Sequence, residues 1–188
     1  MAHKPVPPPP TRYGAAAAAQ AAHRHPAAQA AGHPSAAQAK AGAGYKLVLG
    51  AYLHQDTGRL PAELAGHGFV AIERPDGRRE AFGFSPANYS GMDPKRDFGR
   101  LNAGVQGKVH GDAQAFSKPG AVTRAVPISP QQAQAAMAKV AEYKTGHRTF
   151  SATRCQCTDF AKDVARAAGV DAGPARGPRA FYDSLRKK

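Results

Sequence analysis

Two cysteines lie near the end of the chain, and one of them has the local setting of a nucleophile. Cys157 lies in the segment TRCQCTDFAKDVARAAG, where a loop gives way to an amphipathic helical pattern. A thiol at a helix N-terminus is close to unpaired backbone N–H groups and to the positive end of the helix dipole, which favour the thiolate. The nearby Arg154 favours it too. Cys155 lies further from the predicted helix start and is the weaker candidate; the two are also too close in sequence for an ordinary disulfide.

A thiolate nucleophile needs a basic or cationic partner, and histidine suits this role. Four of the eight histidines fall in the first 44 residues, which leaves His54, His67, His110 and His147. His67 stands out because it begins the strongly patterned segment GHGFVAIE between two glycines. Small neighbours allow another element, such as a helix end, to approach closely. His147, ten residues before Cys157, is the alternative.

Alternating and β-rich segments predict the strands that position His67. We expect strands over residues 45–53, 66–73, 78–85 and 121–128. Pro75-Asp76-Gly77 is a turn sequence, so it predicts an antiparallel hairpin from the second and third strands. Residues 86–120 are rich in Gly, Pro, Asp and Asn and predict a long loop.

Helical patterns fill the last third of the chain. Ser129, Pro130 and Gln132 form a capping-box start for a helix that ends at Gly146. A second helix is predicted from Cys157 to Gly169, and a short third one over residues 178–185. Strands come first and helices last, and the strands are too closely spaced for β-α-β crossovers. The order predicts an α+β fold.

The first 44 residues differ from the rest in composition. They hold 17 Ala, most of the early Pro, and no Asp or Glu, so we expect a disordered leader over 1–44 and one folded domain over 45–188. The net charge is +13; with four of the 26 Lys and Arg in the leader, the domain keeps +9. Such an excess attracts an acidic polymer or surface. No secretory signal is convincing, and no apolar run approaches the ~20 residues of a membrane span.

The segments GHGFVAI, FGFSP, SPQQA and CTDFAKDVARAAGV together resemble the circularly permuted papain-like amidases, which are relatives of the NlpC-type peptidoglycan hydrolases. The resemblance spans residues 45–185. It implies a small antiparallel sheet packed against helices, with Cys157 as nucleophile and His67 as base. One position departs from the family pattern, because Gln156 stands where Asn is frequent.

The residue that orients His67 depends on the register of the hairpin. A three-residue turn sets Ser85 opposite His67, whereas a shift by one residue brings Glu80 to that face. Asn88, just beyond the hairpin, is a further alternative. Ser85 is the first choice among them.

The resemblance implies hydrolysis of an amide bond, most naturally in peptidoglycan peptides, by acyl transfer to Cys157. Delivered antibacterial toxins, including type VI secretion effectors, are built this way. It therefore implies a protein that is cytoplasmic before export and reaches a target-cell periplasm without a cleaved signal peptide. A secretion-system carrier and a neutralising immunity protein would be its partners.

Other functions stay open. A protein deamidase, or a lipid acyltransferase or thioesterase, on the same fold would need a more apolar groove, and a non-catalytic basic binding module would need no reactive thiol. Metal binding through Cys155, Cys157 and His147 lacks a second ligand pair, so we expect no metal and no cofactor. Specific nucleic-acid binding has no supporting motif, and the chain has no Trp for base stacking.

Overall fold

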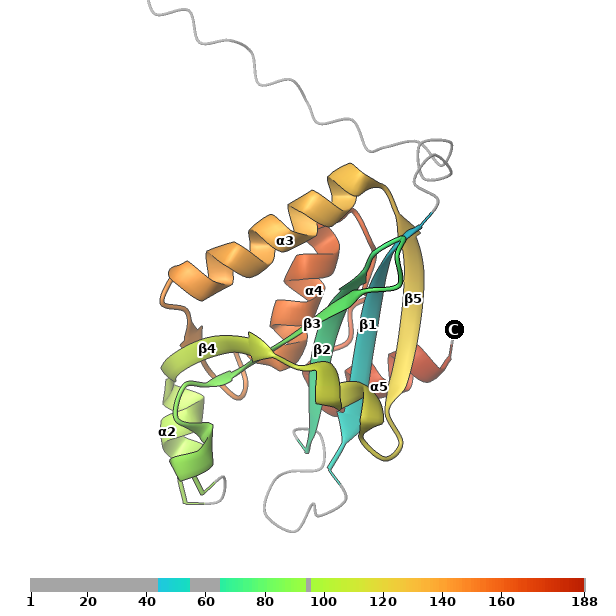
Figure 1. Ribbon diagram of the computed structural model, residues 1–188. Coiled ribbons are helices and arrows are strands. Elements are labelled where there is room, and N and C mark those ends of the chain that lie inside the picture. The colour runs from blue at the N-terminus through green and yellow to red at the C-terminus, as the bar shows by residue number, and fades with distance from the viewer. Residues whose placement is uncertain (1–43, 55–64, 94–95, 188) are drawn as a thin grey trace, which may run out of the picture. The chain divides into compact units, whose positions relative to one another are not determined.

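The computed structural model describes residues 44–54, 65–93 and 96–187 (Figure 1). The predicted leader lies outside these residues except for Gly44. The described part contains a six-stranded antiparallel sheet in the order β5-β1-β2-β3-β4-β6. Its strands are β1 (Tyr45–Leu53), β2 (Gly66–Glu73), β3 (Arg79–Pro86), β4 (Val105–Gly111), β5 (Val122–Ile128) and β6 (Thr149–Phe150).

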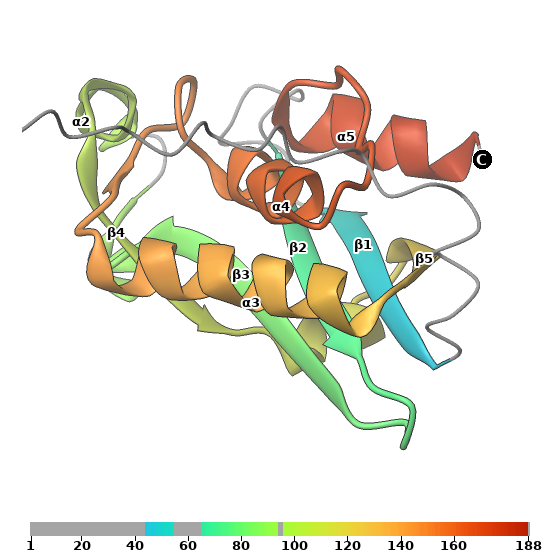
Figure 2. The same cartoon turned by 90° about the horizontal axis from the view of Figure 1, so that it is seen from above.

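The longer helices cover one face of the sheet, as Figure 2 shows. They are α3 (Pro130–Thr145), α4 (Cys157–Ala167) and α5 (Gly177–Arg186). The short helix α2 (Phe98–Ala103) and the 3₁₀ turn η1 (Tyr89–Gly91) lie between β3 and β4 in sequence, and the 3₁₀ turn η2 (Ala113–Ser117) follows β4. The α+β class is therefore confirmed. Within the described ranges, no helix combines the length and the apolar character needed to span a bilayer.

The strands β1 and β2 are almost continuously apolar because both of their faces are covered. Val70 and Ile72 of β2 join the main core between sheet and helices, whereas Ala71 belongs to a second cluster on the opposite face. On that face Phe116 of η2 packs edge-on against Phe69, with ring centroids 4.9 Å apart. Strands that are covered on both faces have no solvent side to keep polar.

The predicted hairpin is confirmed. Its turn is Pro75-Asp76-Gly77 with Gly77 at φ 80°, and Phe69 pairs with Gly83. This register, continued toward the strand ends, is the one that aligns Ser85 with His67. The predicted strands at 45–53 and 121–128 and the three predicted helices are also confirmed to within a few residues.

The prediction of a long loop over residues 86–120 is wrong. That segment contains α2, β4 and both 3₁₀ turns. β4 has the sequence VQGKVHG, in which Val105, Gly107 and Val109 alternate with polar residues. The alternation is a strand signal, but the glycines and the surrounding turn residues hide it.

Candidate active site

Cys157 is the first residue of α4, as predicted. The helix start is fixed by Asp159, whose Oδ2 accepts a hydrogen bond of 3.0 Å from the backbone N–H of Gln156. The thiol is buried, with 5% of the Cys157 surface exposed. The backbone N–H of Gly68 donates to Cys157 Sγ over 3.4 Å, which links the helix start to β2.

The glycines on either side of His67 permit this close approach. A Cβ at Gly68 would lie 2.8 Å from Thr158 Cγ2, and one at Gly66 would lie 3.0 Å from Pro178 Cβ. Real Cβ atoms essentially never approach within 3.0 Å, so a side chain at position 68 would push the start of α4 away. The expectation that small neighbours of His67 admit a helix end is confirmed.

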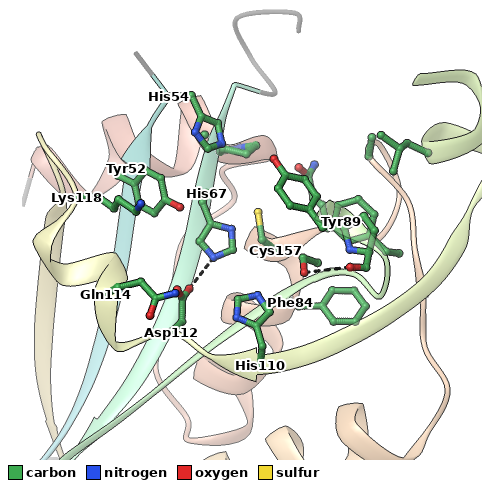
Figure 3. Close-up of a pocket in the computed structure, with 18 of the residues that line it drawn as sticks. Tyr52, His54, His67, Phe84, Tyr89, His110, Asp112, Gln114, Lys118 and Cys157 are labelled. Carbon is green, nitrogen blue, oxygen red and sulfur yellow. Dashed lines mark hydrogen bonds and ion pairs between the residues drawn. The ribbon is translucent and has the colours of Figure 1, made fainter. Parts of the chain in front are cut away.

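His67 is held by a carboxylate that the sequence did not lead us to expect. Its Nε2 forms a hydrogen bond of 2.7 Å with Oδ2 of Asp112, the residue that follows β4. Asp112 is buried, and its backbone N–H donates to Ala81 O over 2.9 Å. Figure 3 shows the imidazole of His67 between this carboxylate and the sulfur of Cys157. The three side chains therefore lie in the order carboxylate, imidazole, thiol.

Gly83 of β3 makes room for this pair. A Cβ on Gly83 would lie 2.6 Å from Asp112 Oδ2 and 2.9 Å from His67 Nε2. The missing side chain leaves space directly beneath the hydrogen bond, so any larger residue at position 83 would have to displace one of the two partners.

The charge state of His67 follows from these contacts. Burial opposes a charge on the ring, but the hydrogen bonds to Asp112 and Cys157 outweigh it and raise the pKa of His67 to about 10. The ring is therefore an imidazolium across the neutral range.

Further polar groups surround this arrangement. Tyr52 pairs with His67 across β1 and β2, and their rings lie 5.6 Å apart. Burial, together with the charges of Asp112 and Cys157, raises the pKa of Tyr52 to about 12, so its hydroxyl keeps its proton. Burial and the neighbouring charge of His67 lower the pKa of His54.

The three residues predicted to orient His67 have different surroundings. Ser85 borders the same cavity, but its hydroxyl donates to Pro86 O over 3.3 Å. Glu80 forms an ion pair with Arg74, and Asn88 is exposed and precedes η1. Within the described residues, His67 has none of the three as a hydrogen-bond partner.

Asp112 was missed because β4 was predicted to be a loop. The available signal was an Asp at the end of the alternating segment 105–111, where a strand ends beside its neighbours. A strand there would have placed Asp112 beside β3, where Gly83 leaves room for its carboxylate to reach His67.

The alternative site residues are not brought together. His147 is an exposed residue after α3, at φ 47°, and does not border the cavity. Cys155 is half-buried, and burial raises the pKa of its thiol. Nowhere in the described residues do three or more His, Cys, Asp or Glu side chains gather in a way that could hold a metal ion, so Cys155, Cys157 and His147 form no such group.

A cavity of ≈ 240 Å³ opens beside Cys157, and its two sides differ in character. The first side, called here the polar wall, consists of His54, His67, Asp112, Gln114 and Lys118. The second, called here the apolar wall, consists of Phe84, Tyr89, Phe98, Leu101 and Phe150. In Figure 3 the labelled members of the two walls lie on opposite sides of Cys157.

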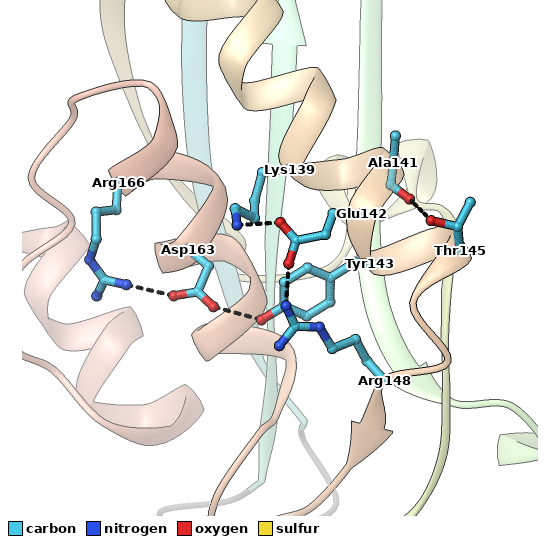
Figure 4. A network of polar contacts seen from close by, with 8 residues as sticks. All are labelled: Lys139, Ala141, Glu142, Tyr143, Thr145, Arg148, Asp163 and Arg166. Carbon is cyan, nitrogen blue, oxygen red and sulfur yellow. Dashed lines mark hydrogen bonds and ion pairs between the residues drawn. The ribbon is translucent and has the colours of Figure 1, made fainter. Parts of the chain in front are cut away.

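Several polar contacts lie on α3 and α4 where the two helices pack together (Figure 4). The hydroxyl of Tyr143 donates to Asp163 Oδ2 over 2.7 Å, and Arg166 donates to the other oxygen of Asp163 over 2.7 Å. Glu142, on α3, forms ion pairs with Lys139 and with Arg148 after the helix. Of these contacts, the hydrogen bond between Tyr143 and Asp163 joins the two helices, and the others lie within α4 or within α3 and the segment after it.

Comparison with known proteins gives no match: no protein-family model fits the chain, and no curated protein or solved structure matches it. The function is therefore argued from the site.

Proposed function

We propose that the protein is a cysteine hydrolase that cleaves an amide bond, with Cys157 as nucleophile, His67 as acid and base, and Asp112 as the residue that orients His67. One observation carries the proposal. A buried thiol at a helix start adjoins an imidazole that a buried carboxylate holds at 2.7 Å, and all three border one cavity. Nucleophile, base and orienting group in this order are the recurring elements of acyl-transfer sites.

In the proposed reaction the thiolate of Cys157 attacks the carbonyl carbon and forms a tetrahedral oxyanion. The backbone N–H of Cys157, unpaired at the helix start, is placed to donate to that oxyanion. His67 gives its proton to the leaving amine as the C–N bond breaks, which leaves an acyl thioester. His67 then takes a proton from water, the resulting hydroxide equivalent attacks the thioester, and the acid and the thiolate are released.

The substrate class that we propose is a peptidoglycan peptide. The proposal draws on the resemblance to permuted papain-like amidases and on the domain charge of +9, which suits an acidic polymer. The same resemblance is our reason for proposing a papain-like arrangement of the sheet and helices. Delivery as an antibacterial effector, with an immunity protein in the producing cell, belongs to this proposal.

A second candidate is a thioesterase or acyltransferase on the same fold. The apolar wall favours it, because phenyl and leucyl side chains border the cavity beside Cys157. The chemistry at Cys157 would be the same, with a thiol or alcohol as leaving group in place of an amine.

The test begins with the thiol. Iodoacetamide should label Cys157 rapidly below pH 8, and Cys157→Ala should remove both the labelling and all hydrolysis. Cys155→Ala is the matched control, because its thiol lies two residues away outside the cavity, and it should retain activity. Slow labelling of Cys157 at an ordinary rate would contradict the proposal.

The bond that is cut requires a separate measurement. Purified wall sacculi are digested with the wild-type protein and with Cys157→Ala, and the released fragments are analysed by mass spectrometry. New fragments that require Cys157 would identify the cleaved bond. Intact sacculi together with hydrolysis of simple esters would instead favour the second candidate, and intact sacculi with an unreactive thiol would leave the basic binding module.

A further inference from the structure

The elements that form the apolar wall are held together by hydrogen bonds and ring contacts. The backbone N–H of Ala152 donates to Leu101 O over 3.1 Å, and the hydroxyl of Ser151 donates to Asn102 O over 2.9 Å. These bonds tie α2 to the segment after β6. On the other side Phe150 meets Phe84 of β3 with ring centroids 5.7 Å apart. Three elements are thus joined into one apolar surface beside Cys157.

Tyr89 extends this surface to the mouth of the cavity. It is 50% exposed, and among the described residues it is the large hydrophobic side chain left exposed. Figure 3 shows its ring on the side of Cys157 opposite to His67. An exposed aromatic side chain that continues an apolar cavity is suited to cover a ligand.

The position of His67 sets the direction of a bound substrate. His67 must protonate the leaving group, so the leaving group has to lie toward the polar wall. The acyl part of the substrate then extends to the other side of Cys157 Sγ, which is the side of Phe84 and Tyr89 in Figure 3. The apolar wall therefore faces the acyl side of the scissile bond.

The size of the cavity limits what this side can hold. Its ≈ 240 Å³ is shared by the reacting carbonyl and the acyl substituent. Pockets for drug-sized ligands have volumes of about 300–1,000 Å³. The space beside Cys157 suits one side-chain-sized group.

We infer that the substrate carries a compact apolar group, aromatic or branched, on the acyl side of the bond that Cys157 attacks. The inference rests on the proposed hydrolysis at Cys157 and departs from the proposed peptidoglycan substrate, whose peptides carry small or charged residues on the acyl side. It favours a peptide or acyl compound with a large apolar residue at that position over one with only small or charged residues there.

The experiment compares p-nitrophenyl phenylacetate with p-nitrophenyl acetate. Thiolysis by Cys157 releases nitrophenolate from both esters, and water then releases the carboxylic acid. The ratio of their kcat/KM values, phenylacetyl over acetyl, is divided by the ratio of the rates at which a small free thiol reacts with the same two esters. This corrected ratio removes the difference in intrinsic reactivity between the esters. We expect the corrected ratio to favour the phenylacetyl ester about 10- to 100-fold, the range for burying one aromatic group.

Two variants test whether the apolar wall causes the preference for the phenylacetyl ester. Tyr89→Ser and Phe98→Ser should each lower the corrected ratio several-fold, because each removes an aromatic ring from the apolar wall. Tyr182→Ser is the matched control: Tyr182 is a half-buried tyrosine on α5 that does not border the cavity, so the ratio should stay unchanged. A ratio is used because it is insensitive to the amount of folded protein.

The outcomes separate the two proposals. A corrected ratio near one, with rapid iodoacetamide labelling of Cys157, would overturn the inference and leave the hydrolase standing. A large ratio that Tyr89→Ser and Phe98→Ser leave unchanged would overturn it too. No hydrolysis of either ester, with an unreactive Cys157, would reject the proposed function itself.

Discussion

Two aspartates in this molecule form hydrogen bonds of the same length that have different roles. Asp112 and His67 meet over 2.7 Å, and Asp163 and Tyr143 meet over 2.7 Å. The first pair borders the cavity and adjoins the Cys157 thiol, whereas the second lies between α3 and α4. A hydrogen bond to a carboxylate acquires a chemical role only when its partner can reach a reacting atom, and otherwise it stabilises packing. The two pairs can be separated experimentally.

The largest effect is expected from Asp112→Asn. The amide keeps the shape of the carboxylate but cannot neutralise an imidazolium, so kcat should fall by up to about 10⁴-fold, the loss known for the orienting carboxylate of the Ser-His-Asp triad. Ester hydrolysis measures the change. Asp163→Asn is the matched control and should leave kcat within about twofold, because Asp163 does not contact His67. Equal losses in both variants would mean that the first pair is only structural.

Gly83→Ala should have the next largest effect on the rate. Its Cβ would lie within 3.0 Å of both Asp112 Oδ2 and His67 Nε2, so the pair has to separate. We expect kcat to fall by about 10²-fold, the loss typical of a misplacement near 1 Å. Gly111→Ala is the matched control, because a Cβ there meets nothing within 4 Å. If Gly83→Ala retains full activity, the close packing around His67 is not required for the reaction.

Tyr143→Phe tests the second pair through stability. The substitution removes a hydrogen bond to a charged group and leaves Asp163 with Arg166, so the free energy of unfolding should fall by about 1.5–3 kcal/mol. Urea denaturation measures this change, with unchanged kcat per folded molecule expected. Arg166→Gln, which breaks an exposed ion pair with the same Asp163, should cost only about 0–1 kcal/mol. A larger loss in Arg166→Gln than in Tyr143→Phe would contradict this ranking.

The difference between the two aspartates also explains what could be predicted from sequence. Cys157 carried local signals, because a helix pattern and its start are written in adjacent residues. The hairpin register around His67 followed from the Pro75-Asp76-Gly77 turn. Asp112 depended on a strand whose pairing with β3 is long-range, and the glycines at positions 107 and 111 removed the apolar alternation that would have predicted it.

The walls of the cavity could not be predicted for the same reason. Phe98, Leu101 and Phe150 come from α2 and β6, which lie together beside the edge of the sheet where β4 pairs with β6. A segment rich in Gly, Asp and Asn gives no local hint of that contact. Sequence reasoning therefore pointed to Cys157 through local patterns and to His67 mostly through the family resemblance, and it missed Asp112 and the apolar wall, which depend on tertiary pairing.

The last expected effect is a change in pH dependence. The pKa of His67 is raised from its ordinary 6.5 to about 10, so the ring keeps its proton while the pH rises through the neutral range. An ordinary thiol with a pKa near 8.5 becomes about 80-fold more reactive toward iodoacetamide between pH 6.5 and 9. If the imidazolium of His67 stabilises the thiolate as proposed, the reaction rate of Cys157 should rise much less than this over that interval.

Asp112→Asn should restore the ordinary dependence, because the pKa of His67 falls when its carboxylate partner is removed and the ring loses its charge within the interval. The raised pKa of His67 also makes the stability of the fold depend on pH. A group whose pKa is raised on folding stabilises the fold fully below pH 6.5 and loses that contribution as the pH rises toward 10. Asp163→Asn should change neither curve. An unaltered, flat profile in Asp112→Asn would show that the thiolate is stabilised by the start of α4 rather than by the imidazolium, and would assign Asp112 the same packing role as Asp163.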